Sequence, residues 1–192
     1  MTTFIHDTAT IEPNVTIGKE CKIWHYSHLR EGVTLEDSVS LGKGTYIDPH
    51  ILISKGTRIQ NGVSIYKGVN LAAWCFVGPH VVFTNDRSPR SGKKEWLVEQ
   101  TIVETGASIG AGTIIKSGIT IGAFSLIGAG SIILNDLPPF AIARGNPILV
   151  CGYTCVCGDS RFEDDSQGKI QDCCVQSLSK DFLENAKDYL SK

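Results

Sequence analysis

Hydrophobic side chains recur along this chain every six residues. From Ile5 to Phe83 every sixth residue is aliphatic or aromatic, and the same step returns in a new phase from Val103 to Ile133. A period of six fits neither the 3.6-residue repeat of an α-helix nor the alternation of a single strand. It fits short strands separated by corners, with one inward side chain from each strand. The pattern therefore predicts a solenoid of stacked strands.

A second position of the repeat, four residues after the aliphatic one, carries small or β-branched residues such as Val33 and Thr57. Such side chains suit pleated strands. Cys21 and Cys75 occupy this position, so we expect both in the core. Pairs such as Asn61-Gly62 stand where the chain would have to turn. Together these features predict a parallel β-helix, in which each coil buries its inward side chains by stacking on its neighbours.

The hexapeptide pattern, from about residue 5 to residue 138, resembles that of the left-handed β-helix acyltransferases. The resemblance implies the handedness and three hexapeptides per coil. We therefore expect an all-β fold, a left-handed parallel β-helix of about seven coils, with an inserted loop and a short C-terminal helical extension. The β-helix domain would cover residues 1–147, with the loop at 84–102. Residues 148–192 would form a cysteine-containing tail and an amphipathic helix.

The predicted helix lies in the last segment, "SLSKDFLENAKDYLSK". Apolar residues recur there at helical spacing, from Phe182 to Leu190, behind Ser179 as a candidate N-cap.

Composition narrows the classes of function. The chain has 192 residues, a net charge of −2 and 20% charged residues. It has no basic excess for nucleic acid, no apolar run that could span a membrane and no signal-peptide pattern. Seven cysteines are an odd number, and they are not spaced as in a secreted scaffold, so we expect reduced thiols and a cytoplasmic location.

Several stretches carry a narrower resemblance. They are "KIWHYSHLREGVTL", "RIQNGVSIYKGVNL", "CFVGPHVVFTND" followed by "PRS", "GASIGAGTIIKSGITIGAFSLIGAGSII" and the closing "NDLPPFAIARGNP". Together they resemble the bacterial nucleotide-sugar N-acetyltransferases that act on 3-amino sugars in surface polysaccharide synthesis. The resemblance implies acetyl-CoA as donor and a homotrimer with its groove between subunits. "IQNGVSIYKGV" favours UDP-2-acetamido-3-amino-2,3-dideoxyglucuronic acid, whereas "FTND…PRS" is shared with enzymes for dTDP-3-amino-3,6-dideoxyhexoses.

The polar loop that interrupts the repeat supplies the candidate catalytic residues. Asn85 could orient the amine, and Asp86 could accept a proton or bind the ammonium form. Arg90 could pair with a phosphate or carboxylate of the substrate, and Trp96 offers the loop an apolar anchor.

Further substrate-binding candidates are His25, within the resembling stretch "IWHYSHL", Tyr66 and His80. In relatives the position of His80 is more often asparagine or serine. A histidine could also act as general base, so the identity of that base stays open.

Small residues in the second half of the repeat predict where acetyl-CoA binds. Glycine and alanine would let an extended pantetheine lie close to the backbone. The candidates for this wall are Gly110, Ala111, Ala129 and Gly130, with Gly110 or Ala111 as N–H donors to the oxyanion. Lys116 and Arg144 could meet the nucleotide phosphates. Relatives commonly continue "GNPAR" where this chain reads "GNPIL", so one arginine is missing here.

Five cysteines lie in the tail: Cys151, Cys155, Cys157, Cys173 and Cys174. Some relatives carry a zinc-ribbon-like segment at this place. Zinc sites usually use C-x₂-C pairs, whereas C-x-C and adjacent cysteines are irregular for that purpose. We therefore expect reduced thiols and no metal, with zinc left open.

Three other classes of function remain. An O-acetyltransferase could use the same prism. A γ-carbonic-anhydrase-like metal enzyme would need three histidines at coil spacing, and His25, His28, His50 and His80 do not stack in that way. A non-catalytic scaffold would have no need of the long polar loop.

Overall fold

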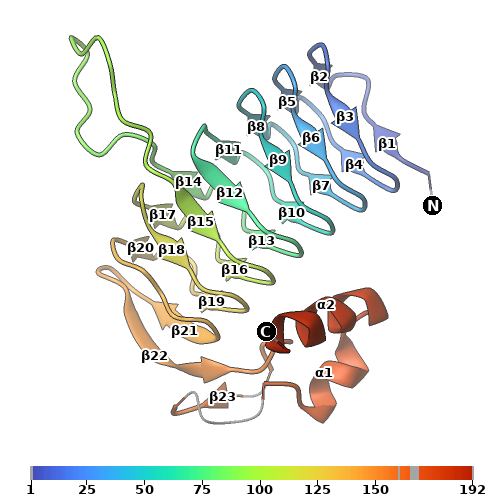
Figure 1. The fold of residues 1–192 in the computed structure, drawn as a ribbon, viewed down its shortest axis with the longest axis vertical. Helices are drawn as coiled ribbons and strands as arrows, with labels where there is room; N and C mark the ends of the chain where they lie inside the picture. The colour runs from blue at the N-terminus through green and yellow to red at the C-terminus, as the bar shows by residue number, and fades with distance from the viewer. Residues whose placement is uncertain (1, 160, 165–168, 192) are drawn as a thin grey trace.

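Short parallel strands stack into a three-sided prism (Figure 1). The computed structural model describes residues 2–159, 161–164 and 169–191. Sheet A begins with β1 (Phe4–Ile5), β4 (Lys22–Ile23), β7 (Ser40–Leu41), β10 (Arg58–Ile59), β13 (Phe76–Val77), β16 (Ser108–Ile109) and β19 (Leu126–Ile127). Sheet B contains β2 (Thr10–Ile11), β5 (His28–Leu29), β8 (Tyr46–Ile47), β11 (Ser64–Ile65), β14 (Val82–Phe83), β17 (Ile114–Ile115) and β20 (Ile132–Ile133). Sheet C contains β3 (Thr16–Ile17), β6 (Thr34–Leu35), β9 (Leu52–Ile53), β12 (Val69–Leu71), β15 (Thr101–Val103) and β18 (Thr120–Ile121).

The register confirms a coil of 18 residues. Ile5 pairs with Ile23, and Leu29 with Ile47. Across the inserted loop the partners are Phe83 and Ile115, 32 residues apart, so the insertion adds 14 residues and leaves the strand pairing unchanged. With the bridge from Ile121 to Leu137 the prism makes about eight turns, so the predicted count of seven is approximate.

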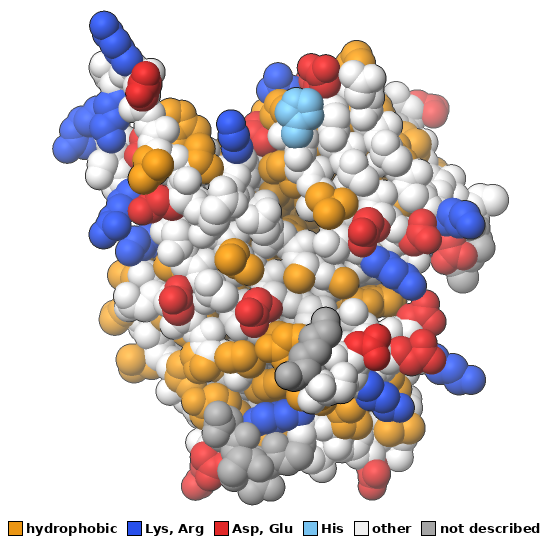
Figure 2. Space-filling model, viewed as in Figure 1, with side chains coloured by type: hydrophobic (Ala, Val, Ile, Leu, Met, Phe, Trp, Pro, Cys, Tyr) orange, Lys and Arg blue, Asp and Glu red, His pale blue; other side chains and the backbone are white. Residues whose placement is uncertain are grey.

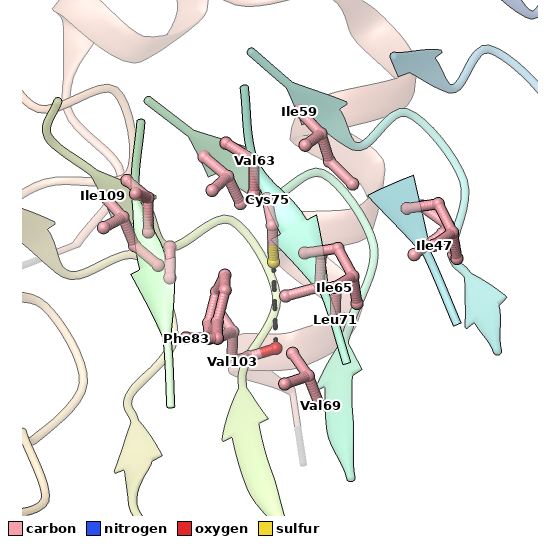
Figure 3. Close-up of a cluster of buried hydrophobic side chains, with 14 of the residues drawn as sticks. Ile47, Ile59, Val63, Ile65, Val69, Leu71, Cys75, Phe83, Val103 and Ile109 are labelled. Carbon is pink, nitrogen blue, oxygen red and sulfur yellow. Dashed lines mark hydrogen bonds between the residues drawn. The ribbon is translucent and has the colours of Figure 1, made fainter. Parts of the chain in front are cut away.

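The residues of the six-residue repeat point inward and form one continuous core (Figure 3). Ile47, Ile65 and Ile109 are fully buried. Cys21 and Cys75 are buried as predicted, and burial raises the pKa of the Cys75 thiol to about 12. In the first coil Ile5 and Ile11 remain about two fifths exposed, because they end the described stack.

Three edges separate the sheets, and they place the candidate residues. The A–B edge contains the corner residues that follow the strands of sheet A, the B–C edge those that follow sheet B, and the C–A edge those that follow sheet C. At many corners one residue adopts a positive φ, as His50 and His80 do. Such corners return the backbone to the next strand within a few residues.

The tail closes one end of the prism and returns along its side. β21 (Ala141–Arg144) continues sheet A, and β22 (Leu149–Thr154) and β23 (Arg161–Phe162) extend it as antiparallel strands that sequence analysis did not predict. The short helix α1 (Asp172–Ser177) was not predicted either. The predicted helix is α2 (Lys180–Leu190), and Ser179 Oγ caps it by accepting from Phe182 N–H at 3.3 Å.

Helix α2 packs against the C–A edge. The Phe182 ring contacts Trp74 and Phe124 at centroid distances of 5.6 and 6.0 Å. Thr105 Oγ1 lies 2.8 Å from Asn185 Oδ1. The tail therefore occupies the C–A edge, and the other two edges and sheet B stay clear of α2.

Candidate functional site

The first group of candidate residues lies on the A–B edge. Register places Ile23, Val77, Ile109 and Ile127 in one column of sheet A. Two or three residues beyond these strand ends stand His25, His80, Ala111, Ala129 and Gly130. Gly110 stands one residue beyond its strand, and Arg144 is the last residue of β21, directly after Ala143, the register partner of Ile127. The histidines proposed for substrate and the small residues proposed for acetyl-CoA thus share one edge.

A second group lies on the B–C edge, across sheet B. Tyr66, Thr84 and Lys116 each follow a strand of the column β11, β14 and β17, and the loop with Asn85 and Asp86 leaves from the same edge. Lys116 therefore does not stand beside Gly110 and Ala129, as the acetyl-CoA assignment would require within one chain. It stands beside the base of the loop, because a lysine after sheet B belongs to a different corner.

The inserted loop projects from the prism (Figure 1), and Lys and Arg side chains gather on the projection (Figure 2). Its base is fixed. Thr84 Oγ1 donates to Ile115 C=O at 3.1 Å and accepts from Ser117 N–H at 3.0 Å. On the returning side, Glu99 Oε2 accepts from Ser117 Oγ at 3.0 Å.

Asn85 and Asp86 follow this anchor directly, and both are half-buried. Asp86 Oδ1 accepts from Ser88 N–H at 2.8 Å, so this carboxylate shapes the first turn of the loop.

Farther along the loop, Arg87 forms an exposed ion pair with Glu99 at 3.5 Å. Arg90 donates to Pro89 C=O at 2.7 Å and is exposed. Trp96 is 43% exposed and lines a hollow of about 490 Å³ with His50, Lys67 and Asn70. Trp96, the predicted apolar anchor of the loop, therefore lies across this hollow from the B–C edge of the prism.

The A–B edge allows close approach at its glycines. A Cβ on Gly110 would lie 2.5 Å from Ala129 N, so only glycine fits there. The Gly110 N–H donates to Ile127 C=O at 2.9 Å. This N–H is already used in the hydrogen bonding between coils and is not available to an oxyanion. Of the two predicted oxyanion donors this leaves Ala111, which is exposed and whose N–H has no partner within the described residues.

Arg144 has a neighbour that sequence analysis missed. Arg144 and Arg161 line one hollow of about 290 Å³ with Gly128, Cys151 and Phe162. Both arginines are exposed. The antiparallel turn from β21 to β23 brings Arg161 there, and no repeat in the sequence signals that turn.

His25 has a partner at the other end of the same edge. Its ring stacks on His6 with centroids 3.4 Å apart, although His6 has no predicted role. His25 also lines a hollow of about 200 Å³ with Trp24, Lys43 and Asn61.

His28 is engaged in an ionic network with Glu12. His28 Nε2 lies 2.8 Å and Arg30 Nε 2.7 Å from Glu12 Oε1. These contacts, with that of His28 the largest, lower the pKa of Glu12. Arg30 also donates to Tyr46 Oη at 2.9 Å, which donates to Asp48 Oδ1 at 2.8 Å.

The tail cysteines divide into two kinds. Cys151 is exposed and its Sγ donates to Ile142 C=O at 3.4 Å. The Sγ atoms of Cys155, Cys157, Cys173 and Cys174 all lie within 4.8 Å of one another. Burial raises the pKa of the Cys174 thiol.

The comparisons with known proteins agree with the fold. A family model described as the hexapeptide repeat of succinyl-transferase matches residues 8–49 and 100–135, on both sides of the inserted loop. Both matched segments lie in the strand-forming part of the chain, so this chain shares its six-residue repeat with that family. A hexapeptide-repeat-containing acetyltransferase from Vibrio cholerae O1 biovar eltor, solved with acetyl coenzyme A, has a TM-score of 0.55 at 22% identity. The alignment covers 64% of this chain and 71% of that one and shows a common fold.

One curated relative matches at the level of sequence. It is a dTDP-3-amino-3,6-dideoxy-α-D-galactopyranose 3-N-acetyltransferase from Aneurinibacillus thermoaerophilus, 35% identical over 72 residues. The match spans 38% of this chain and 38% of the relative. Separately, no helix among the described residues is long and apolar enough to cross a membrane.

Proposed function

We propose that the protein transfers an acetyl group from acetyl-CoA to the 3-amino group of a nucleotide-linked amino sugar. The observation that carries the proposal is the insertion at the B–C edge, which presents Asn85 and Asp86 from a base fixed by Thr84, Ser117 and Glu99. A non-catalytic scaffold would not need a polar loop anchored in this way. The matching relative is named for the same reaction on a dTDP-linked sugar, which supports this class of substrate.

In this proposal the neutral amine attacks the thioester carbonyl carbon and forms a tetrahedral oxyanion. The C–S bond then breaks, CoA leaves as the thiolate, and the surplus proton of the nitrogen passes to a base or to water. Asn85 accepts a hydrogen bond from the amine and directs the nitrogen lone pair, and Asp86 is the candidate proton acceptor. The Ala111 N–H is the candidate oxyanion donor.

The two groups of residues lie on different edges of one chain, so the proposal requires a second copy. The last three strands of sheet B carry an apolar stripe on their outward face, because Val82 pairs with Ile114 and Ile114 with the half-buried Ile132. Val82 and Ile114 are 48% and 40% exposed. On sheet C the exposed Leu52 and Ile102 are separated by the polar Asn70.

We assign the stripe to the interface of a homotrimer. Sheet B is bordered by the A–B edge on one side and by the B–C edge on the other. Around a three-fold axis with sheet B inward, the A–B edge of each chain meets the B–C edge of the next. Lys116 then approaches the acetyl-CoA wall of the neighbouring chain, although it is far from the wall of its own.

Within this assembly the A–B edge holds acetyl-CoA. Gly110, Ala111, Ala129 and Gly130 form the wall for pantetheine, and Arg144 with Arg161 pairs with the nucleotide phosphates. Arg161 takes the place of the arginine that "GNPIL" lacks. His25, His80, Tyr66 and Arg90 contact the nucleotide sugar.

The favoured acceptor is UDP-2-acetamido-3-amino-2,3-dideoxyglucuronic acid, with a dTDP-3-amino-3,6-dideoxyhexose as the alternative. A cytoplasmic location fits a reaction that consumes acetyl-CoA. The full chain would be incubated with acetyl-CoA and a panel of UDP- and dTDP-linked 3-amino sugars, with release of CoA thiol and product mass as readouts. Thiol release that depends on one amino sugar supports the proposal. Release that needs no amine, or acetylation of a hydroxyl, contradicts it.

A further inference from the structure

Four cysteine sulfurs of the tail come together from two segments. Cys155 and Cys157 lie at the turn that follows β22, and Cys173 and Cys174 belong to the first turn of α1. The Cys155 Sγ lies 3.3 Å from that of Cys157 and 3.7 Å from that of Cys173. The Cys157 Sγ lies 3.4 Å from that of Cys173 and 3.5 Å from that of Cys174.

These separations match the ligand shell of a tetrahedral metal ion. Zn²⁺ binds thiolate sulfur at about 2.3 Å, so the sulfurs of a regular tetrahedron lie about 3.8 Å apart. A disulfide would require about 2.05 Å, and none of the seven cysteines is in a disulfide. The four sulfurs are therefore spaced for a shared ion and not for pairwise oxidation.

The surroundings also suit a closed metal site. Cys155 and Cys174 are fully buried, and the other two are half-buried. Gln171 N–H points at Cys174 Sγ, with the nitrogen 3.4 Å from the sulfur. Backbone donors of this kind orient and stabilise thiolate ligands.

The tail contributes few fully buried side chains of its own, and residues such as Phe182, Leu183 and Tyr189 pack against them while only partly buried. Its cluster of buried residues is small and includes Cys155, Val156, Cys174 and Ala186 beside Phe124 and Phe140 of the prism. A structural metal commonly replaces a hydrophobic core in segments of this size. The cysteines join β22 to α1, and α1 leads through Ser179 into α2 on the C–A edge.

We infer that Cys155, Cys157, Cys173 and Cys174 form a tetrathiolate site for one structural Zn²⁺ ion, which fixes the tail and α2 to the prism. Four sulfur ligands leave no open position for a substrate, so the site is structural and not catalytic. From the irregular cysteine spacing we expected no metal and left zinc open, and the inference takes up that open alternative. The C-x-C pair and the adjacent cysteines come from two facing segments, so regular C-x₂-C knuckles are not needed.

The chain offers a matched control in Cys151. It belongs to the same tail, but it lies outside the cluster and is exposed. Wild type, Cys151→Ser, Cys157→Ser and Cys173→Ser would be produced with zinc in the medium, purified without chelators and analysed by elemental mass spectrometry. We expect about one zinc per chain in wild type and Cys151→Ser, and a small fraction of that in the other two.

Two measurements on wild type keep the proposal testable if the cluster variants misfold. First, replacement by Co²⁺ should produce the thiolate charge-transfer and visible bands of tetrahedral cobalt. Second, a strong chelator should lower the melting temperature and make four further thiols reactive toward a disulfide reagent, besides that of Cys151. Wild type without bound metal, or with iron in place of zinc, would overturn the assignment. So would a disulfide within the cluster, or equal zinc loss in Cys151→Ser.

Discussion

Ser117 N–H donates to Thr84 Oγ1 over 3.0 Å, and this bond ties the start of the inserted loop to the next coil. The two residues are 33 positions apart in sequence, yet they are neighbours because the prism resumes its register beyond the loop. Asn85 follows Thr84 directly. The projecting loop therefore begins beside an anchored residue, and an amine-orienting group requires a position held in this way.

The first prediction concerns Asn85. Asn85→Ala should lower kcat for the amino sugar about 30–200-fold and leave the KM for acetyl-CoA unchanged, because the nitrogen lone pair loses its orientation. Asn85→Asp should also be slow near neutral pH, since a carboxylate favours the unreactive ammonium. Steady-state kinetics measures both, with Ser91→Ala as the control. Normal kcat and KM in Asn85→Ala would move this role to Asp86 or to a histidine.

The second prediction separates the arginines by substrate. Arg90→Ala should raise the KM for the nucleotide sugar alone, and Arg144→Ala and Arg161→Ala should raise the KM for acetyl-CoA alone. Each of these substitutions removes one exposed contact between an arginine and an anionic group of the substrate, and should raise the corresponding KM several-fold. Arg87→Ala is the control, because Arg87 pairs with Glu99 of its own loop. The same effect of Arg90→Ala on both substrates would argue against its placement.

The third prediction concerns assembly. Light scattering should give three times the 20.8 kDa of one chain, and Ile114→Arg on sheet B should dissociate the trimer by burying a charge in the stripe. Mixed trimers of Asn85→Ala and His25→Ala chains should regain part of the activity that each lacks alone, because some of their sites combine two intact edges. A fully active monomer would contradict the interface.

The fourth prediction compares two glycines at corners. Gly56 has φ +70°, and a Cβ there would lie 2.4 Å from the Trp74 ring. Gly44 has φ +66° with nothing within 4 Å of an added Cβ. Gly44→Ala should cost only the left-handed backbone penalty, about 1–2 kcal/mol, whereas Gly56→Ala should cost more and displace α2, which packs on Trp74. Urea unfolding measures the loss of stability in each variant. Equal losses would show that the Trp74 ring can move aside without a cost in stability.

The fifth prediction is a pH dependence. Contacts with His28 and Arg30 lower the pKa of Glu12 below its ordinary 4.5. The unfolded chain therefore takes up a proton on Glu12 at a higher pH than the folded chain does. Stability from this group is present above pH 4.5 and is lost as the pH falls through the lowered folded value. Glu12→Gln should then lower the urea midpoint near neutral pH but lose this effect in acid, in contrast to Glu95→Gln on the exposed loop.

The sequence predicted the repetitive part of the structure because one physical rule acts on every coil. Every sixth residue must be apolar because it is buried inside its own coil. Ile23 and Ile127 are therefore both buried, although they are distant in sequence. Ser179 and the apolar spacing behind it were likewise enough to place α2. The Asn85 position at the end of a regular strand followed from the same counting.

Other features depend on contacts that no period encodes. Lys116 was grouped with the acetyl-CoA wall by its place in a glycine-rich stretch, but the corner that a residue occupies depends on which sheet precedes it. The Gly110 N–H was a plausible oxyanion donor until the ladder bond to Ile127 was known. The antiparallel strands β22 and β23 bring Arg161 beside Arg144. Helix α1 brings Cys173 and Cys174 to Cys155 and Cys157. The sequence alone revealed neither arrangement.

The 32-residue separation of Phe83 and Ile115 has a consequence for how a protein of this kind can change in evolution. The coils on either side pair as if the extra residues were absent, so the segment between Asp86 and Val98 behaves as an exchangeable cassette. Substituting the corresponding segment of a relative that uses another nucleotide sugar should transplant acceptor preference and leave the melting temperature of the stack unchanged. On the proposed function, we therefore expect acceptor selectivity to change by loop replacement, without any compensating change in the core.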